Sequence, residues 1–359
     1  MIKPLIFNSL KLLFIFKKRK LDFKPEKILL IRSAAIGDVI MTTPLIRTLK
    51  ENFRAASIDY LVGNWSKRVF DNNPNINKVI SFDDSVVVDK KIGGLKRIIT
   101  RLKKEKYDLC IVLDKHFVWN LIAFLIKPKF RLGFDRAGEG FPNNLSVPYN
   151  ASKYELEYYL DVARKLGLSI KTRKPEVFAS KKDISSIDRL IARNKNFLVI
   201  APAGAKNPGQ ELAAKRYPKE KYTDIIDKLA EKRKIILIGG KEDKKITSWV
   251  FNKCENKRNI LDTTGKINIQ QTAYLISKTK LLLTNDSGAM HIGSTTNTKI
   301  IAIFGPTAPK RFAPKGAMVI RSKKHKPCYD MYGRSKKPIP DYYEDVTPEQ
   351  ILKIINNLI

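Results

Sequence analysis

The sequence is poor in the residues that build disulfide frameworks and metal centres. It has three cysteines and three histidines among 359 residues. Cys110, Cys254 and Cys328 lie far apart without a Cys-x-x-Cys pair, and no His, Cys or Asp cluster has the spacing of a metal site. This composition argues against a disulfide scaffold and a structural zinc site, fits a reducing compartment, and makes metal-independent chemistry the expectation.

Several common catalytic and nucleotide-binding motifs are also missing. The sequence contains neither Gly-x-x-x-x-Gly-Lys-Ser/Thr nor Gly-x-Gly-x-x-Gly, which excludes a P-loop and an ordinary dinucleotide site. It contains no Gly-x-Ser-x-Gly elbow and no Cys–His pairing that points to a nucleophile. These motifs therefore indicate no candidate nucleophile.

Acidic residues are scarce relative to basic ones. There are 35 Asp and Glu residues against 69 Lys and Arg residues, a formal net charge of +34. Such a charge attracts polyanions, namely nucleic acid, anionic lipid or phosphorylated substrates, or it reflects a solvated lysine-rich surface. A nucleic-acid-binding protein is the non-enzyme alternative. We find no recognised DNA- or RNA-binding motif and no interleaved aromatic and basic stripe, so no specific nucleic-acid partner is expected.

No apolar run at the N-terminus is long enough to span a bilayer. The run over residues 5–16 is interrupted by Asn8 and Lys11. Four basic residues follow it at positions 17–20, and no small-residue cleavage site is evident, so a secretory signal is not expected. Two interpretations of residues 1–26 stay open. The favoured one is a helix on an anionic membrane surface, and the other is a helix packed on the domain or a frayed end.

From residue 27 onward, short apolar runs alternate with amphipathic segments. This alternation predicts an α/β protein with two Rossmann-like, doubly wound parallel sheets, in domains 27–180 and 181–359. The charged, weakly patterned stretch after residue 168 marks the boundary. The expected strands are 27–32, 58–63, 78–82, 107–114, 131–135, 196–204, 234–240, 259–265, 280–286 and 299–305. The expected helices lie near 39–53, 66–72, 92–105, 117–126, 153–168, 218–232, 242–253, 268–278 and 287–295.

The segment "GDVIMTTP" (37–44) follows the first strand. Ligands of such sheets bind beyond the carboxyl ends of the strands, so this turn is a candidate site. Gly37 permits close backbone approach. Asp38 is either a helix N-terminal carboxylate favoured by the dipole or a general base for an attacking hydroxyl. Thr42, Thr43 and Pro44 are poor choices inside a plain helix, which predicts a role at the cleft.

A second candidate segment is "TNDSGAMHIGS" (284–294), which follows a strand of the second domain. The residues of interest are Asp286, Ser287, Gly288 and His291. The N–H groups at a helix start can bind phosphate, and Asp286 can order a sugar hydroxyl; the alternative is a helix cap and a packing histidine. Lys310 and Arg311 follow the next strand at the same edge. This second basic segment favours a site for an anionic ligand.

Two further loops of the second domain carry candidate residues. The small-residue loop "APAGAKNPGQELAAKRYP" (201–218) can hold a diphosphate. Its members of interest are Ala203, Gly204, Lys206, Lys215 and Arg216. In "GGKED" (239–243), Glu242 either caps a helix or holds a ribose.

Two of these segments together resemble the family 9 glycosyltransferases, the lipopolysaccharide heptosyltransferases. They are "ILLIRSAAIGDVIMTTPLIRTLKENF" (28–53) and "NDSGAMHIGSTTNTKIIAIFGPT" (285–307), and the likeness runs from about residue 27 to the end. It implies a GT-B fold, with two Rossmann-like domains facing a central cleft. The first domain would bind the acceptor and the second the sugar nucleotide, in an inverting, metal-independent transfer.

The resemblance also implies roles for single residues. Asp38 matches the family's general base, and Lys215 in "KRYP" matches the lysine that stabilises the donor diphosphate. Glu242 matches a ribose contact. The family's D-[ST]-G-x-x-H segment falls on Asp286, Ser287, Gly288 and His291. The first donor loop departs from the family, with "PAGAKN" where relatives often have threonine or serine.

The implied co-substrate is a nucleotide sugar, ADP-heptose, with no other cofactor. The implied acceptor is a lipopolysaccharide or lipid A core. The enzyme is then expected in the cytoplasm, peripheral on the inner face of the cytoplasmic membrane. The enzyme alternative within the same fold is a nucleotide-sugar epimerase, which needs no separate acceptor.

Overall fold

A computed structural model describes residues 20–192, 196–330, 334–335 and 338–359. The chain divides into two compact units, Met1–Glu176 and Val177–Ile359. Most of the N-terminal segment for which we predict membrane contact, residues 1–26, lies outside the described residues, so that prediction stays untested. Within the described ranges, every helix is too short or too polar to cross a bilayer.

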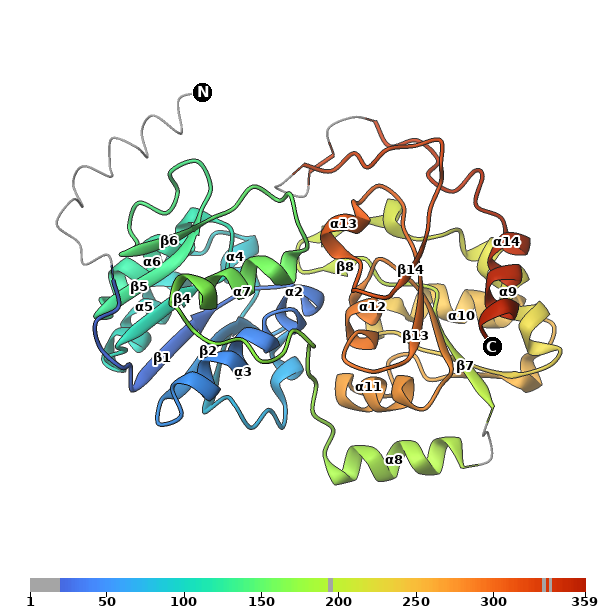
Figure 1. The fold of residues 1–359 in the computed structure, drawn as a ribbon. Coiled ribbons are helices and arrows are strands. Elements are labelled where there is room, and N and C mark those ends of the chain that lie inside the picture. Colours follow the sequence, from blue (N-terminus) through green and yellow to red (C-terminus); the bar gives the residue numbers. More distant parts are fainter. Residues whose placement is uncertain (1–19, 193–195, 331–333, 336–337) are drawn as a thin grey trace. The chain divides into compact units, whose positions relative to one another are not determined.

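The first unit contains a six-stranded, all-parallel sheet (Figure 1). Its spatial order is β3-β2-β1-β4-β5-β6. The strands are β1 (Lys27–Ile31), β2 (Ser57–Gly63), β3 (Lys78–Phe82), β4 (Leu109–Val112), β5 (Phe130–Asp135) and β6 (Leu145–Pro148). The five predicted strands are confirmed. β6 was not predicted because it is short, ends in a proline, and buries only one of its four residues.

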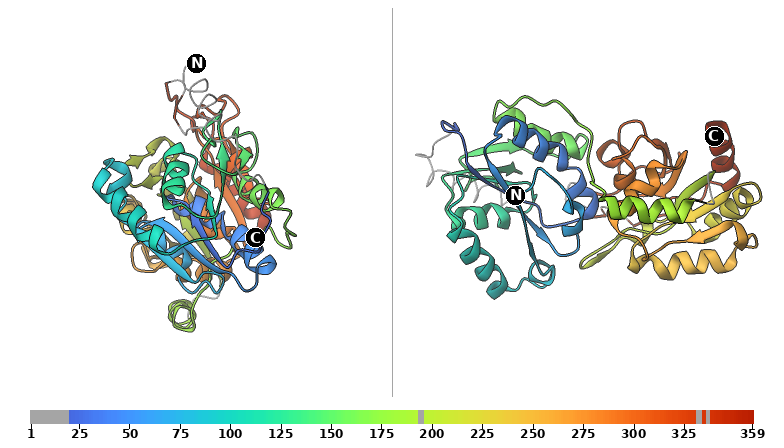
Figure 2. Two further views of the ribbon diagram at one scale, coloured as in Figure 1. Left: turned by 90° about the vertical axis from the view of Figure 1, so that its left-hand side faces the viewer. Right: turned by 90° about the horizontal axis from the view of Figure 1, so that it is seen from below.

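Helices cover both faces of this sheet (Figure 2). The helices are α2 (Ile36–Ile40), α3 (Thr43–Asn52), α4 (Ser85–Val88), α5 (Ile92–Lys104), α6 (Phe117–Ile126) and α7 (Glu155–Lys165), with a 3₁₀ turn at Lys67–Phe70. α5 and α6 contact one another, as do α3 and α7. Because side chains of a strand alternate between faces, Leu29 and Ile31 both join Trp119 and Ile122 in the core beneath α5 and α6.

The prediction of one continuous helix over 39–53 is wrong. α2 ends at Ile40 and α3 begins at Thr43, with Pro44 in its first turn. Proline at the start of a helix loses no hydrogen bond, whereas inside a helix it would clash with the carbonyl four residues earlier. The hydroxyls of Thr42 and Thr43 donate to the carbonyls of Val39 (2.7 Å) and Ile40 (2.8 Å), which satisfies the end of α2.

The second unit has another six-stranded parallel sheet, in the order β11-β10-β7-β12-β13-β14. The strands are β7 (Phe197–Ala201), β10 (Lys234–Leu237), β11 (Ile260–Asp262), β12 (Leu281–Asn285), β13 (Lys299–Ile303) and β14 (Met318–Ile320), and β8 (Lys206–Asn207) and β9 (Gln210–Glu211) form a short hairpin. The five predicted strands are confirmed here too. β14 was not predicted, since it has three residues of which one is buried.

The helices of the second unit form two layers. α9 (Lys219–Ala230), α10 (Lys244–Lys253) and α14 (Pro348–Leu358) share one core with the sheet. α8 (Lys181–Ile191) contacts α11 (Ile269–Ser277), which contacts α12 (Gly288–Gly293) against β12. α13 (Pro309–Phe312) and 3₁₀ turns at Ala213–Lys215, Lys241–Asp243 and Lys257–Asn259 complete the unit. α8 begins with a Ser180–Asp183 capping box, a local signal in the stretch that we interpreted as a boundary.

The two sheets have the same topology, which positions the candidate sites. In each unit the first strand is central, the next two strands lie on one side of it, and the fourth lies on the other. The direction of winding therefore reverses between β1 and β4, and again between β7 and β12. Loops leaving neighbouring strands at such a point separate and leave room for a ligand. The residues that directly follow these four strands are thus the ones to examine.

Candidate functional site

In the first unit, Asp38 lies in the first turn of α2, just after β1. Its carboxylate pairs with the Arg32 guanidinium at 2.8 Å and with the Lys115 ammonium at 3.4 Å, and it accepts a hydrogen bond from the Tyr159 hydroxyl at 3.1 Å. The Asp38 side chain is 23% exposed, more than either cation that holds it. A solvent-accessible carboxylate is therefore fixed by three donors from three separate elements.

Arg32 joins the ends of β1 and β4. Its Nη2 contacts Asp38, and its Nη1 donates to Asp114 at 2.9 Å. Burial alone would lower the pKa of Arg32, but the carboxylates outweigh it and the pKa is raised. Burial likewise opposes ionisation of Asp114, yet Arg32 and the Ser33 N–H and hydroxyl lower its pKa. Both groups stay charged, and they fix the geometry around Asp38.

Lys115 supplies the second cation of this cluster. Its Nζ lies 2.7 Å from Glu155, whose side chain is fully buried and also accepts a hydrogen bond from the Tyr149 hydroxyl at 2.6 Å. Burial would lower the pKa of Lys115, but Glu155, Tyr159 and Asp38 raise it. Arg32, Asp114 and Lys115 were not among the predicted site residues. Their positions in the sequence could have indicated them, since Arg32 directly follows β1, and Asp114 and Lys115 lie just after β4.

The other predicted residues of this turn have structural roles. Thr42 and Thr43 are 0% and 1% exposed. The Thr42 Oγ1 lies 2.9 Å from the Tyr60 hydroxyl, and the Thr43 Oγ1 accepts the Glu176 N–H at 2.8 Å. Gly37 is buried within α2. Their burial corrects the expectation that Thr42 and Thr43 line a cleft: their hydroxyls hold the break between α2 and α3 that presents Asp38.

In the second unit, the structure brings Lys215 and Asp286 together. The Lys215 Nζ lies 2.8 Å from the Asp286 Oδ2, which also accepts a hydrogen bond from the Thr307 hydroxyl at 2.6 Å. The Asp286 side chain is 2% exposed and that of Lys215 is 16% exposed. The Asp286 carboxylate is therefore buried, and Lys215 is the more exposed member of the pair.

Gly204 joins three loops at this edge of the sheet. Its φ is +95°, and a Cβ there would lie 2.6 Å from the Cβ of Ser287, so only glycine fits this contact between the loops after β7 and β12. The Gly204 N–H donates to Asp243 at 2.9 Å, and Arg216 donates to the Gly204 carbonyl at 2.8 Å. Asp243 rather than its exposed neighbour Glu242 ties the third loop to this point.

Asn285, the last residue of β12, was also missed by sequence reasoning. Its side-chain amide donates to the carbonyls of Pro202 and Ala203 and accepts hydrogen bonds from the Tyr217 N–H and the Tyr222 hydroxyl. It is fully buried, so it fixes the small-residue loop to the sheet. Ala203, at 2% exposure, is part of that anchored backbone.

The remaining predicted residues separate into buried and exposed groups. Ser287 precedes α12 and lies 3.2 Å from the Thr284 hydroxyl, and Gly288 is the first residue of α12. His291 is 5% exposed. Lys310 is exposed, whereas Arg311 is buried and donates to the Asp330 carbonyl at 3.1 Å. Among the described residues, no group of three or more His, Cys, Asp or Glu side chains could hold a metal ion.

Comparison with known proteins places these features in a family. Residues 95–338 match the model of "Glycosyltransferase family 9 (heptosyltransferase)". The chain is 25% identical to lipopolysaccharide heptosyltransferase 2 of Salmonella typhimurium, over 93% of this chain and 98% of that protein.

Two solved structures show the same fold. The Escherichia coli ADP-heptose LPS heptosyltransferase II superposes with a TM-score of 0.73 at 23% identity, covering 92% of this chain and 98% of the other. A family 9 glycosyl transferase from Veillonella parvula superposes with a TM-score of 0.77 at 20% identity, covering 95% and 99%. Together with the two parallel sheets, these likenesses confirm the predicted GT-B fold class.

The contact between Gly204 and Ser287 gives a testable prediction. In Gly204→Ala, the alanine must adopt a left-handed backbone and its Cβ also clashes with that of Ser287. We therefore expect this substitution to lower the free energy of unfolding by about 3 kcal/mol. Gly316→Ala is the matched control: Gly316 has φ +86° and open space around it, so only the backbone cost of about 1–2 kcal/mol applies. Urea unfolding of both variants measures the difference. Equal losses would mean that the loops do not require this close approach.

Proposed function

This chain belongs to glycosyltransferase family 9, and we propose that it transfers a heptose from ADP-heptose to a hydroxyl of a lipopolysaccharide or lipid A core. The observation that carries the proposal is the pair of charged centres, one per unit. Asp38 is an accessible carboxylate in the first, and Lys215 is an accessible cation held by Asp286 in the second. The donor and acceptor assignment is supported by the family description and by the names of the relatives above.

In the proposed reaction, Asp38 accepts the proton of the acceptor hydroxyl. Arg32, Lys115 and Tyr159 hold the Asp38 carboxylate in one orientation, so that it can meet the acceptor hydroxyl without rearranging. The deprotonated oxygen attacks the anomeric carbon from the side opposite the nucleotide, the carbon–oxygen bond to the diphosphate breaks, and the configuration inverts. The first unit, 27–180 in the predicted division, would then bind the acceptor.

The second unit, predicted as 181–359, would bind the sugar nucleotide. Lys215 stabilises the negative charge that develops on the departing diphosphate, which is the role that a preorganised cation performs best. Asp286 and Phe312 hold Lys215 in place before the donor arrives. We propose that the backbone N–H groups from Ser287 to Ala289 and the turn at Ala203 and Gly204 surround the phosphates, with Glu242 near the ribose and His291 as a further donor contact.

The acceptor suggests where the enzyme works. A lipid-linked core is presented at the inner face of the cytoplasmic membrane, and a chain with net charge +34 is attracted to its phosphates and to anionic headgroups. We propose a cytoplasmic enzyme, peripheral on that surface, with the apolar and basic segment 1–26 contributing to the contact.

Asp38→Asn tests the base. The amide keeps the size of the side chain but cannot take a proton, so we expect kcat to fall by roughly 10² or more. The affinity for the nucleotide should not change, because the proposed donor site belongs to the other unit. Steady-state assays and calorimetry measure the two quantities, with the exposed Asp89→Asn as the control. A kcat within about twofold of the parent would remove Asp38 from this role.

Lys215→Ala tests the leaving-group site. Loss of a charged contact to the diphosphate should weaken ADP binding by about tenfold or more. Because this variant also leaves the buried Asp286 without its cation, Lys215→Ala combined with Asp286→Asn shows whether the loss follows the ammonium. Lys253→Ala, an exposed lysine of α10, is the charge-matched control. Calorimetry giving the parent Kd for ADP in both Lys215 variants would reject the assignment.

A further inference from the structure

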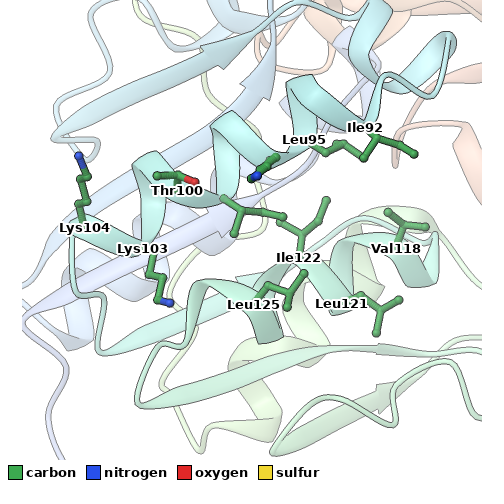
Figure 3. A pocket seen from close by; sticks show the side chains of 11 residues that line it. Ile92, Leu95, Thr100, Lys103, Lys104, Val118, Leu121, Ile122 and Leu125 are labelled. Carbon is green, nitrogen blue, oxygen red and sulfur yellow. The ribbon is translucent and has the colours of Figure 1, made fainter.

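The outer side of α5 and α6 carries an apolar groove that has no part in either charged centre. Its volume is 890 Å³. Figure 3 shows the two helices running alongside one another, with apolar side chains between them and Lys103 and Lys104 at one end. The apolar lining is Ile92, Leu95, Ile99, Val118, Leu121, Ile122 and Leu125.

Exposed large apolar residues are concentrated in the stretch of chain that contains this groove. Among the described residues, seven large apolar side chains are exposed, and five of them lie within residues 87–125. Ile92 is 80% exposed and Leu125 is 48% exposed, and both line the groove. Of the apolar side chains of α5, only that of Leu102 is buried. Leu95, Ile99 and Val118, which also line the groove, are only partly buried against the core, and exposed apolar surface of this kind on a folded unit indicates a partner.

The charge beside the groove identifies the chemistry of that partner. α5 carries five basic residues and no acidic one, and α6 carries no charged residue. Lys96, Lys103 and Lys104 line the groove itself. The acidic residue that follows α5, Glu105, is engaged elsewhere, by Lys27 at 2.5 Å and Lys78 at 3.1 Å. Within the part of the chain that the structure describes, Lys96, Lys103 and Lys104 form no ion pair, so they present positive charge next to exposed apolar side chains.

We propose that this surface docks on an anionic phospholipid bilayer. The apolar side chains of α5 and α6 enter the boundary between headgroups and acyl chains, and Lys96, Lys103 and Lys104 contact anionic headgroups. A second copy of the chain fits less well, because a two-fold contact through this groove would bring Lys96, Lys103 and Lys104 of both copies together. The charge pattern thus selects lipid over self-association.

The docking surface is connected to the candidate base by a short piece of chain. Lys115, which contacts Asp38, is followed at once by the start of α6 at Phe117. Binding of α6 to the bilayer would place Asp38 close to a lipid-linked acceptor. This docking surface extends the proposed function and rests on its statement that the chain, with a net charge of +34, works at a lipid surface. It does not depend on which nucleotide sugar is the donor.

A fluorescent label tests the contact directly. All three native cysteines are buried, so Leu125→Cys in the full chain accepts an environment-sensitive dye selectively. Vesicles of equal parts phosphatidylglycerol and phosphatidylcholine should shift its emission to the blue, and pure phosphatidylcholine should not. The matched control is Met318→Cys, at a residue of the second unit that is 39% exposed, where we expect no shift. No shift at position 125, or equal shifts at both positions, would overturn the proposal.

Unlabelled variants test the energetic contribution of the surface. Replacing Lys96, Lys103 and Lys104 together by Gln, or Ile92 and Leu125 together by Ser, should lower partition onto the anionic vesicles by roughly tenfold. Replacing Lys253, Lys257 and Lys280 by Gln removes the same charge from exposed positions of the second unit and should have a much smaller effect. Equal losses for the two lysine sets would mean that net charge alone attracts the chain to the vesicles, and this result would overturn the proposal.

Two readouts separate the alternatives. All of these variants should transfer sugar to a delipidated, water-soluble core acceptor at the rate of the parent chain. If the parent chain itself transfers no sugar, the proposed function fails, and the docking surface is judged by the vesicle experiments alone. Light scattering of the parent should give a monomer without lipid. A concentration-dependent dimer that the Ile92 and Leu125 substitutions abolish would assign the groove to a second copy instead.

Discussion

The reversal of strand order beside the first strand of each sheet is the constraint on which both candidate sites depend. Between β1 and β4, and between β7 and β12, the following loops separate, so residues far apart in the chain meet at one edge. In the first unit this brings Arg32 to Asp114. In the second it brings Gly204 to Ser287, with a separation that only glycine permits.

At each of these edges a carboxylate is paired with a cation. The two pairs differ in which member is the more exposed. Asp38 is more exposed than Arg32, whereas Lys215 is more exposed than Asp286. Removing the buried partner of such a pair is costly because it leaves an uncompensated charge, so the buried member fixes the accessible one. In the proposed reaction, the anion of the first unit accepts a proton and the cation of the second unit stabilises the diphosphate. Inverting transfer of a sugar needs one of each.

Much of the fold, and part of each candidate site, could be predicted from the sequence, because buried parallel strands form apolar runs that are easy to recognise. The ten predicted strands and the positions of Asp38 and Asp286 after strands needed only that pattern, whereas Lys215 was matched to its role through the resemblance to the family. The short edge strands β6 and β14 were missed because they bury little. Arg32, Asp243 and Asn285 were missed because their importance arises from partners on other strands, which periodicity along the chain does not reveal. Thr42 and Thr43 were interpreted as residues of the cleft, although they are buried and their hydroxyls bond to the end of α2 at a local helix break.

We propose that the two charged centres serve one transfer reaction with a separate acceptor. The most direct measurement is the release of ADP from ADP-heptose by the full chain, with and without a lipopolysaccharide core acceptor, followed by mass spectrometry of the acceptor. ADP should appear only when the acceptor is present, and the acceptor should gain the mass of one heptose for each ADP released. Conversion of the nucleotide sugar without acceptor, as an epimerase would carry out, would contradict this proposal.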